Sequence, residues 1–349
     1  MNKQSAGLSG RPIYTLAQNG TESRQPTLAL TGSGSDLDNG KALKGRAKRK
    51  LITQTAMMCL VDIASEKNDP KRRKSFWNTY HCQSIVFTTN GRLYGKYCKN
   101  RFCTLCCSIR KADIINRYLP VIRKWEDPHL ITLTVKSVPY RSLNIVMRQM
   151  ILVLNRIIAK YKKRDARGKG NRLIGIRSLE SEFNPITKEY NPHFHIIVAN
   201  GEMGKILIQE WVKRAKPKKV NRAGQKIDRI FNNITALIEV VKYGSKIFTD
   251  PERKKKKKGT GNEKIYAGAL YNIFNAMKGL RIFERFGFNL PKEKPVKPAT
   301  VSLVKDYQVW EYDLKRFDWY NAAGRGLSEF DPVSQLIELL TNNIDTLLE

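Results

Sequence analysis

The chain of 349 residues contains 64 Lys and Arg against 31 Asp and Glu, which gives a formal net charge of +33. An excess of this size favours a nucleic-acid partner over an anionic membrane surface, and 41% hydrophobic residues exclude a chain that is disordered throughout. The sequence has no run near the roughly 20 apolar residues of a membrane span and no apolar signal-peptide core at its start, so we expect a cytoplasmic protein without a membrane partner.

The first third of the chain divides into an arm and a cysteine-rich unit. Residues 1–50 are rich in Gly, Ser, Asn and Thr and end in a basic run, which predicts a disordered basic arm. A short helix is expected over 51–65, followed by a segment dense in Lys, Arg and Cys. We therefore assign residues 51–125 to this helix and a small cysteine-rich module.

Five of the six cysteines lie between residues 82 and 107. Short spacings between thiols are typical of a structural Zn²⁺ site, and cytosolic thiols stay reduced. The expected ligands are Cys82, Cys98, Cys103 and Cys106. Cys107 or His81 can replace one of them, and a group of ordinary buried cysteines is the alternative interpretation. Because four protein ligands fill a tetrahedral site, we expect this zinc to be structural.

Residues 130–198 predict the order strand, helix, strand, strand. The segment 130–135 is rich in β-formers, and apolar residues between 143 and 161 recur at helical spacing. A second strand begins near Ile174. A loop with two prolines over 184–192 then turns the chain into the segment Asn191-Pro-His-Phe-His-Ile-Ile-Val198.

His193 and His195 alternate with apolar residues in that last strand. Residues two apart in a strand point to the same face, so both imidazoles project together while Phe194 faces the core. Neutral imidazole is the commonest protein metal ligand, and the pair predicts a divalent metal site. A polar strand face covered by a loop is the alternative.

The segment Ile238-Glu-Val-Val-Lys-Tyr-Gly-Ser-Lys246 places Glu239 four residues before Tyr243. On a helix the two lie one turn apart on the same face, with a rise of about 6 Å. Lys242 and Lys246 flank the tyrosine, and ammonium groups help a hydroxyl with a pKa near 10 to act as a nucleophile. An ordinary surface Tyr on a helix remains the alternative. After residue 291 we expect a Lys- and Pro-rich linker and an amphipathic C-terminal helix.

The ordered set HLITLTV (129–135), NPHFHIIV (191–198) and EVVKYGSK (239–246), with CKNRFCTLCCSIRKA (98–112) ahead of it, resembles the replication initiators (Rep proteins) of rolling-circle plasmids. These belong to the HUH endonucleases, and the resemblance is to the branch with a single catalytic Tyr and an upstream Glu. It covers roughly residues 80–290. Glu182 and Thr104 depart from the family pattern, which otherwise has a small polar residue and a proline at these places.

The resemblance implies a metal-dependent DNA nicking-joining enzyme. His193 and His195 would hold Mg²⁺ or Mn²⁺, with Glu180 or Glu182 as the carboxylate ligand from the paired strand. Tyr243 would attack the scissile phosphate, leaving a 5′-phosphotyrosine and a 3′-OH that primes a host polymerase. Glu239 would act as a base at termination, with Lys242 and Lys246 beside the tyrosine.

The implied fold is α+β, an antiparallel sheet with helices on one face, of the ferredoxin-like or palm kind, preceded by the zinc module. The expected divisions are a basic arm over 1–50, the module over 51–125, the endonuclease domain over 126–290, and the linker and helix over 291–349. The expected partners are a plasmid origin with a single-stranded or hairpin nick site, a host helicase and a polymerase, in a bacterial cytoplasm. An HUH transposase or relaxase, or a non-catalytic zinc-containing nucleic-acid-binding protein, are the alternatives.

Overall fold

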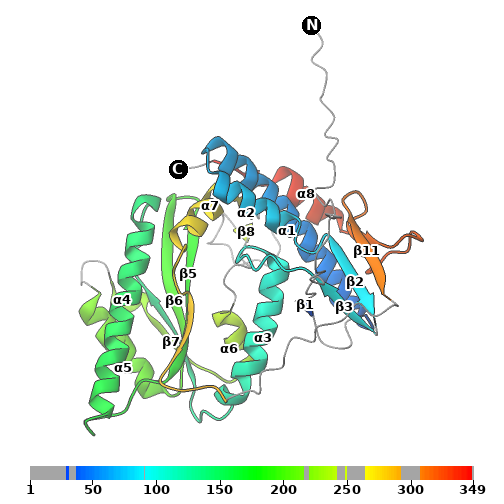
Figure 1. Ribbon diagram of the computed structural model, residues 1–349. Coiled ribbons are helices and arrows are strands. Elements are labelled where there is room, and N and C mark those ends of the chain that lie inside the picture. The colour runs from blue at the N-terminus through cyan, green and yellow to red at the C-terminus, as the bar shows by residue number, and fades with distance from the viewer. Residues whose placement is uncertain are drawn as a thin grey trace, which may run out of the picture.

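The computed structural model describes residues 29–30, 37–89, 91–215, 220–241, 248–249, 264–291 and 307–347. A central five-stranded sheet has the order β10-β5-β6-β4-β7, and every neighbouring pair in it is antiparallel (Figure 1). Its strands are β4 (His129–Thr134), β5 (Gly175–Asn184), β6 (Glu189–Val198), β7 (Lys226–Arg229) and β10 (Phe283–Phe286). The expected α+β class with an antiparallel sheet is confirmed in these terms.

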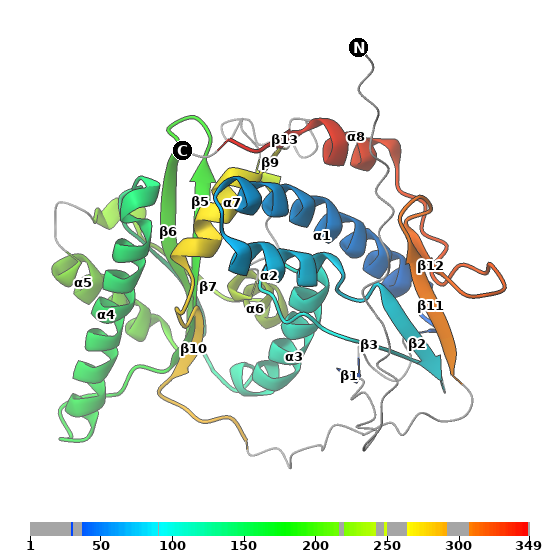
Figure 2. The same cartoon turned by 45° about the horizontal axis from the view of Figure 1, so that its top comes forward.

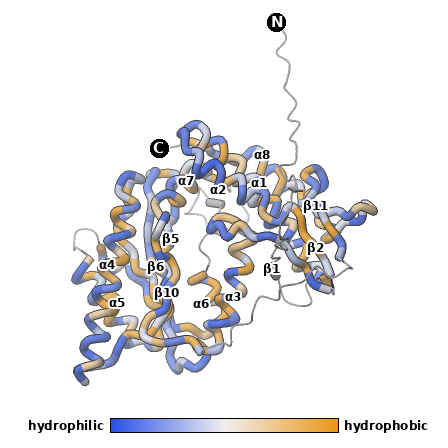
Figure 3. The backbone as a smooth tube through the Cα atoms, in the orientation of Figure 1, coloured by the Kyte–Doolittle hydropathy of each residue, from blue (hydrophilic) through white to orange (hydrophobic). Residues whose placement is uncertain are grey.

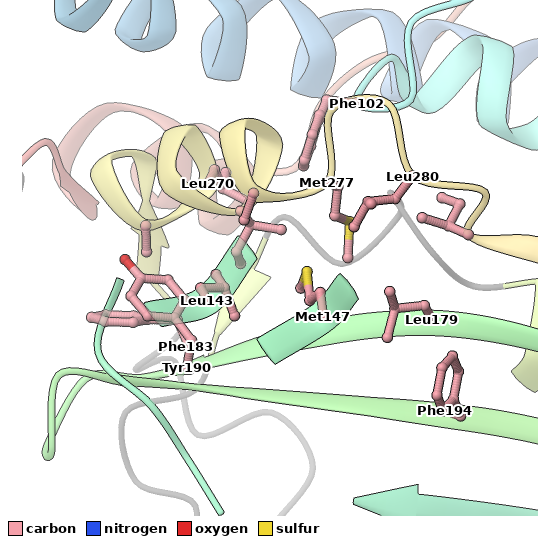
Figure 4. Close-up of a cluster of buried hydrophobic side chains, with 14 of the residues drawn as sticks. Phe102, Leu143, Met147, Leu179, Phe183, Tyr190, Phe194, Leu270, Met277 and Leu280 are labelled. Atoms are coloured by element: carbon pink, nitrogen blue, oxygen red, sulfur yellow. The ribbon is translucent and has the colours of Figure 1, made fainter. Parts of the chain in front are cut away.

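One face of the central sheet packs against α4 (Tyr140–Asp165), α5 (Gly201–Arg214) and α7 (Ala267–Ala276). Strand alternation sends Leu179 and Phe194 to this face, where Figure 4 shows them near Met147 of α4. All three side chains are fully buried, and each contributes about 2 kcal/mol of hydrophobic stabilisation. The α4 helix is long and apolar enough to cross a membrane, but one of its faces is buried against the central sheet.

The opposite face carries α3 (Thr104–Ile122) and α6 (Asn233–Val240). Ile176 and Ile197 point this way and are fully buried among the apolar residues of both helices. The expectation of helices on one face only is therefore wrong, as Figure 1 also shows with α4 and α5 on one side of β5 and β6 and α3 and α6 on the other. The reason is that β5 and β6 have apolar residues at both parities, so each face needs a cover.

Two helices near the start of the chain lie outside the central sheet. They are α1 (Gly40–Glu66) and α2 (Pro70–Tyr80), which pack against each other and, through α1, against α3 and α7. We expected a disordered arm up to residue 50, whereas α1 begins at Gly40. The Asn39 side chain accepts a hydrogen bond from the Ala42 N–H and caps the helix.

A second sheet joins both ends of the chain in the order β1-β3-β2-β11-β12. Its strands are β1 (Ala29–Leu30), β2 (Ile85–Thr89), β3 (Arg92–Gly95), β11 (Gln308–Asp313) and β12 (Asp318–Tyr320). Figure 2 shows β11 and β12, in orange, beside β2, in cyan. The expected linker and helix over 291–349 thus contain two strands, because Trp310 and Trp319 are buried in the core of this sheet.

The end of the chain adds the short helix α8 (Ser334–Asn342) and a three-stranded sheet. That sheet has the order β13-β9-β8 and contains β8 (Phe248–Thr249), β9 (Lys264–Tyr266) and β13 (Ile344–Asp345). The amphipathic helix expected near the C-terminus ends at Asn342, because Ile344 pairs with Ile265 as a strand. One 3₁₀ turn, Arg222–Gly224, precedes β7.

Candidate functional site

Three metal-ligand side chains converge on the α3–α6 face of the central sheet. Glu180 on β5 is paired directly with His193 on β6, and His195 follows on the same face. The Nε2 atom of each histidine lies 3.9 Å from Oε2 of Glu180. All three side chains are largely buried, with His195 the most exposed at 13%. We call these residues the Glu-His-His group.

Backbone and hydroxyl contacts orient the two imidazoles. Nδ1 of His193 donates to the carbonyl of Asn191 at 2.9 Å, which fixes the proton on Nδ1 and leaves the Nε2 lone pair directed at Glu180. Nδ1 of His195 lies 3.4 Å from Oγ1 of Thr132 on β4. The roles of Asn191 and Thr132 were not predicted from the sequence. The signal that could have found Thr132 is its alternation with Thr134 on β4, because Thr132 pairs with His195 and Thr134 pairs with His193.

The donor atoms fit a divalent cation. Bonds of about 2.1 Å from two imidazoles and one carboxylate leave room for an ion between atoms 3.9 Å apart. Three protein ligands also leave coordination positions open for substrate oxygens. Carboxylate suits both Mg²⁺ and Mn²⁺, whereas two imidazoles favour the softer Mn²⁺. Ser178, which is fully buried opposite His195, adds a hydroxyl to the same surface.

The other residues predicted to take part in catalysis differ in how close they lie to the Glu-His-His group. Glu182 pairs with Asn191, two residues closer to the hairpin turn, and lies outside the Glu-His-His group. Glu239 lies in the last turn of α6, whose Leu237 and Val240 pack around Ile197 on the same sheet face as the histidines. The predicted nucleophile Tyr243, with Lys242 and Lys246, lies outside the described residues.

Four cysteine sulfurs form a second compact group, which we call the four-cysteine group. It contains Cys82, Cys98, Cys103 and Cys106, whose sulfurs lie within 4.8 Å of one another. Cys106 Sγ is 3.6 Å from the sulfurs of both Cys82 and Cys98, near the roughly 3.8 Å separation that Zn–S bonds of about 2.3 Å require in a tetrahedron. The two alternative ligands, Cys107 and His81, lie outside this group. The Cys107 thiol donates to the Arg101 carbonyl at 2.8 Å, and the His81 ring stacks on Trp77.

Backbone amides support negative charge on these sulfurs. The N–H groups of Cys98, Asn100 and Cys106 donate to the sulfurs of Cys82, Cys98 and Cys103 respectively, at 3.4 to 3.5 Å. Hydrogen bonding to Cys103 lowers the pKa of the Cys98 thiol, and bonding to Cys106 raises the pKa of Cys103. A bound Zn²⁺ would replace the thiol protons, because the deprotonated thiolate is the form that binds zinc.

A buried lysine that the sequence analysis missed lies against the four-cysteine group. Lys50 on α1 is fully buried, and its Nζ donates to the carbonyls of Tyr80 and Cys82, both at 2.8 Å, and to Ser84 Oγ at 3.1 Å. Burial lowers its pKa to about 8, an effect that the nearby thiols oppose. It ties α1 to the segment that carries the first cysteine ligand.

We expect Lys50→Met to destabilise the fold by about 2 to 3 kcal/mol, because it leaves two buried carbonyls without their donor. Lys48→Met, an exposed change on the same helix, is the matched control and should have no measurable effect. Urea unfolding of the purified variants measures both. Equal stability of the two variants would show that the Lys50 contacts contribute nothing.

Two curated proteins, each named Protein rep, are similar to the chain. The one from Streptococcus pneumoniae serotype 2 (strain D39 / NCTC 7466) is 32% identical over 122 residues, or 31% of this chain and 34% of that protein. The one from Staphylococcus aureus is 29% identical over 107 residues, or 29% of this chain and 44% of that protein. The chain thus spans less than half the length of these relatives. No protein-family model and no solved structure matches it.

Proposed function

We propose that the chain is a plasmid replication initiator, a metal-dependent nicking-joining endonuclease that cuts one DNA strand at an origin and later terminates the round. The observation that carries the proposal is the Glu-His-His group, which is buried on a sheet face beside the helix that bears Glu239. The net charge of +33 supports a DNA partner. The names of the two relatives support a role in replication.

The proposed chemistry assigns one task to each residue. His193, His195 and Glu180 hold a divalent ion, which when bound polarises the scissile phosphate. The Tyr243 hydroxyl gives its proton to water and its oxygen attacks phosphorus, so that a P–O bond to tyrosine forms and the bond to the 3′ oxygen breaks. That oxygen takes up a proton and becomes the 3′-OH primer. Lys242 and Lys246 favour the phenoxide, and Glu239 removes a proton from the attacking group at termination.

The proposal has consequences for metal and partners. A donor set of two imidazoles and one carboxylate should support nicking at lower Mn²⁺ than Mg²⁺ concentration. The 3′-OH requires a DNA polymerase, and strand displacement requires a helicase, so both are proposed as host partners in a bacterial cytoplasm. The four-cysteine group, filled by four protein ligands, is proposed as a structural Zn²⁺ site outside the reaction.

The test is the loss of nicking when the histidines are removed. We expect His193→Ala and His195→Ala each to reduce Mn²⁺-dependent nicking of a supercoiled origin plasmid by about 10³-fold, since a bound cation supplies several kcal/mol of transition-state stabilisation. EDTA should abolish nicking by the wild type. Agarose gels that separate supercoiled from nicked plasmid give the rate.

His129→Ala is the matched control, because His129 lies on neighbouring β4 with its Nδ1 bound to the Asp127 carbonyl, outside the Glu-His-His group. This variant should nick at the wild-type rate. All three variants should bind plasmid DNA equally well, because charge supplies most of that affinity. Nicking by His193→Ala and His195→Ala at the rate of His129→Ala would refute the proposed metal site.

A further inference from the structure

A recess at the C-terminal end of α4 is lined almost entirely by positively charged side chains. It encloses about 500 Å³, and seven Lys or Arg side chains and Ala159 form its walls. Arg156, Lys160 and Lys163 come from α4, and Arg214 comes from the end of α5. No acidic side chain is among the described residues that line it. We call it the basic recess, and Figure 3 shows hydrophilic colouring through this end of α4.

A buried carboxylate anchors two of these cations. Glu210 on α5 is only 12% exposed and forms ion pairs with Lys160 of α4 and, at 2.7 Å, with Arg214. It therefore joins the two helices and holds both basic side chains at the edge of the recess. Asp165, the last residue of α4, pairs with Arg172 at 2.7 Å and does not line the recess.

The turn after α4 adds two more cations. Gly168 adopts a left-handed conformation with φ +64°, and the N–H of Lys169 donates back to the carbonyl of Arg164 at 2.9 Å. This reversal brings Arg167 and Lys169 to the recess beside the helix end. Arg167 and Lys169 are exposed, so their charged groups are available to a ligand.

Stability of the helix alone does not account for this arrangement. Basic residues in the last turn of α4 interact favourably with the helix dipole, which explains Lys163 and Arg164. Arg156 lies more than two turns earlier, Arg214 belongs to another helix, and Lys169 lies beyond the turn. Glu210 offsets the charge of Lys160 and Arg214 only in part, and the other five cations of the recess repel one another, which favours binding of an anion.

We propose that the basic recess binds the phosphate backbone of duplex DNA. DNA as the partner rests on the proposed function, but the site is separate from the nicking centre. The recess is formed by the C-terminal ends of α4 and α5 and the turn after α4. These helices pack on the sheet face of Phe194, whereas His193 and His195 point to the opposite face. Binding and cutting are thus assigned to two sides of one sheet.

The side chains of the recess are suited to phosphate oxygens. Lys and Arg contacts to phosphate oxygens position a protein on DNA without reading sequence. No Asn, Gln or aromatic side chain is among its described lining residues, although such groups read base edges or stack on unpaired bases. The expected ligand is therefore duplex DNA of any sequence.

The experiment removes three exposed charges at once. Lys163→Gln, Arg167→Gln and Lys169→Gln are combined in one full-length variant, and binding to a labelled 20-base-pair duplex without an origin is followed by fluorescence anisotropy at several salt concentrations. We expect affinity to fall on the order of 10- to 100-fold and the slope of log affinity against log salt to fall by about 2 to 3.

The matched control combines Lys71→Gln, Arg73→Gln and Lys74→Gln, three exposed charges on α2. It changes net charge equally and should keep most of the affinity and the slope. Equal losses in both variants would refute the proposal, because net charge alone would then govern binding. A recess variant that binds DNA like wild type also refutes it, as does one that loses only binding to phosphatidylglycerol vesicles.

A second measurement separates this inference from the proposed function. The recess variant should cut a short single-stranded origin oligonucleotide with Mn²⁺ at the wild-type rate, because the oligonucleotide does not need the duplex contact. If wild type cuts no DNA while the recess variant still loses duplex binding, the proposed function fails and the DNA-binding surface stands. If wild type cuts DNA and the recess variant binds duplex normally, only the recess assignment fails.

Discussion

Tyr243→Phe is expected to abolish both nicking and the covalent adduct between protein and DNA. The change removes the proposed attacking oxygen and keeps the aromatic ring, so the loss reports the chemistry of the hydroxyl. An origin oligonucleotide labelled on the 3′ side of the nick, run on a denaturing gel, shows the adduct as a band that protease removes. Residual activity should be at background level, because no other group in the proposed mechanism forms the phosphotyrosine.

Tyr266→Phe is the matched control. Burial and the nearby Asp345 carboxylate raise the pKa of Tyr266, which makes its hydroxyl a poor nucleophile, so this variant should form the adduct normally. Glu239→Gln should also form the adduct but fail to resolve it, so that adducts accumulate through a replication round. An adduct formed by Tyr243→Phe would place the nucleophile elsewhere. Normal termination by Glu239→Gln would contradict the proposed role of Glu239, and with it the resemblance to the branch that uses one catalytic Tyr and an upstream Glu.

Cys103→Ser is expected to release the zinc and unfold the cysteine-rich module. Cys103 is fully buried, caps the start of α3 and contributes one of the four sulfurs, and structural zinc sites supply on the order of 10 kcal/mol of binding free energy to folding. Elemental analysis should find close to one zinc per wild-type chain and far less in the variant. Differential scanning fluorimetry should show a large drop in melting temperature.

Cys107→Ser is the matched control for that loss. Cys107 is also buried on α3, but its sulfur donates to the Arg101 carbonyl, a bond that a serine hydroxyl can replace. This variant should keep its zinc and nearly all of its stability. A zinc-free wild type, or a Cys103→Ser variant as stable as Cys107→Ser, would contradict a structural zinc site.

The parts of the structure that short-range patterns determine could be predicted from the sequence. Strand alternation put His193 and His195 on one face, and the short hairpin between β5 and β6 brought Glu180 opposite them. The sequence left Glu180 and Glu182 as equal candidates, because both have the same parity. Only the register of the hairpin, which pairs Glu180 with His193, separates them.

Contacts between distant segments could not be predicted in the same way. The strands β11 and β12 carry little alternation, and their assignment depends on the pairing of β11 with β2, far away in sequence. The burial of Lys50 depends on carbonyls of Tyr80 and Cys82, which no local pattern around α1 reveals. The two-sided cover of the central sheet likewise follows from where α3 and α6 pack, and helix periodicity alone does not specify a face.

The sheet shared by both ends of the chain has a consequence for synthesis on the ribosome. Trp310 Nε1 donates to Thr88 Oγ1 across 222 residues. At synthesis rates of about 5 to 20 residues per second, β2 is therefore made roughly 10 to 40 s before its partner β11. The edge of β2 that pairs with β11 therefore has no native partner during that interval, and an open strand edge is prone to wrong pairing. Cys82, Cys98, Cys103 and Cys106 precede β11 by about 200 residues, so the proposed zinc site would be complete on the nascent chain long before β11 is made.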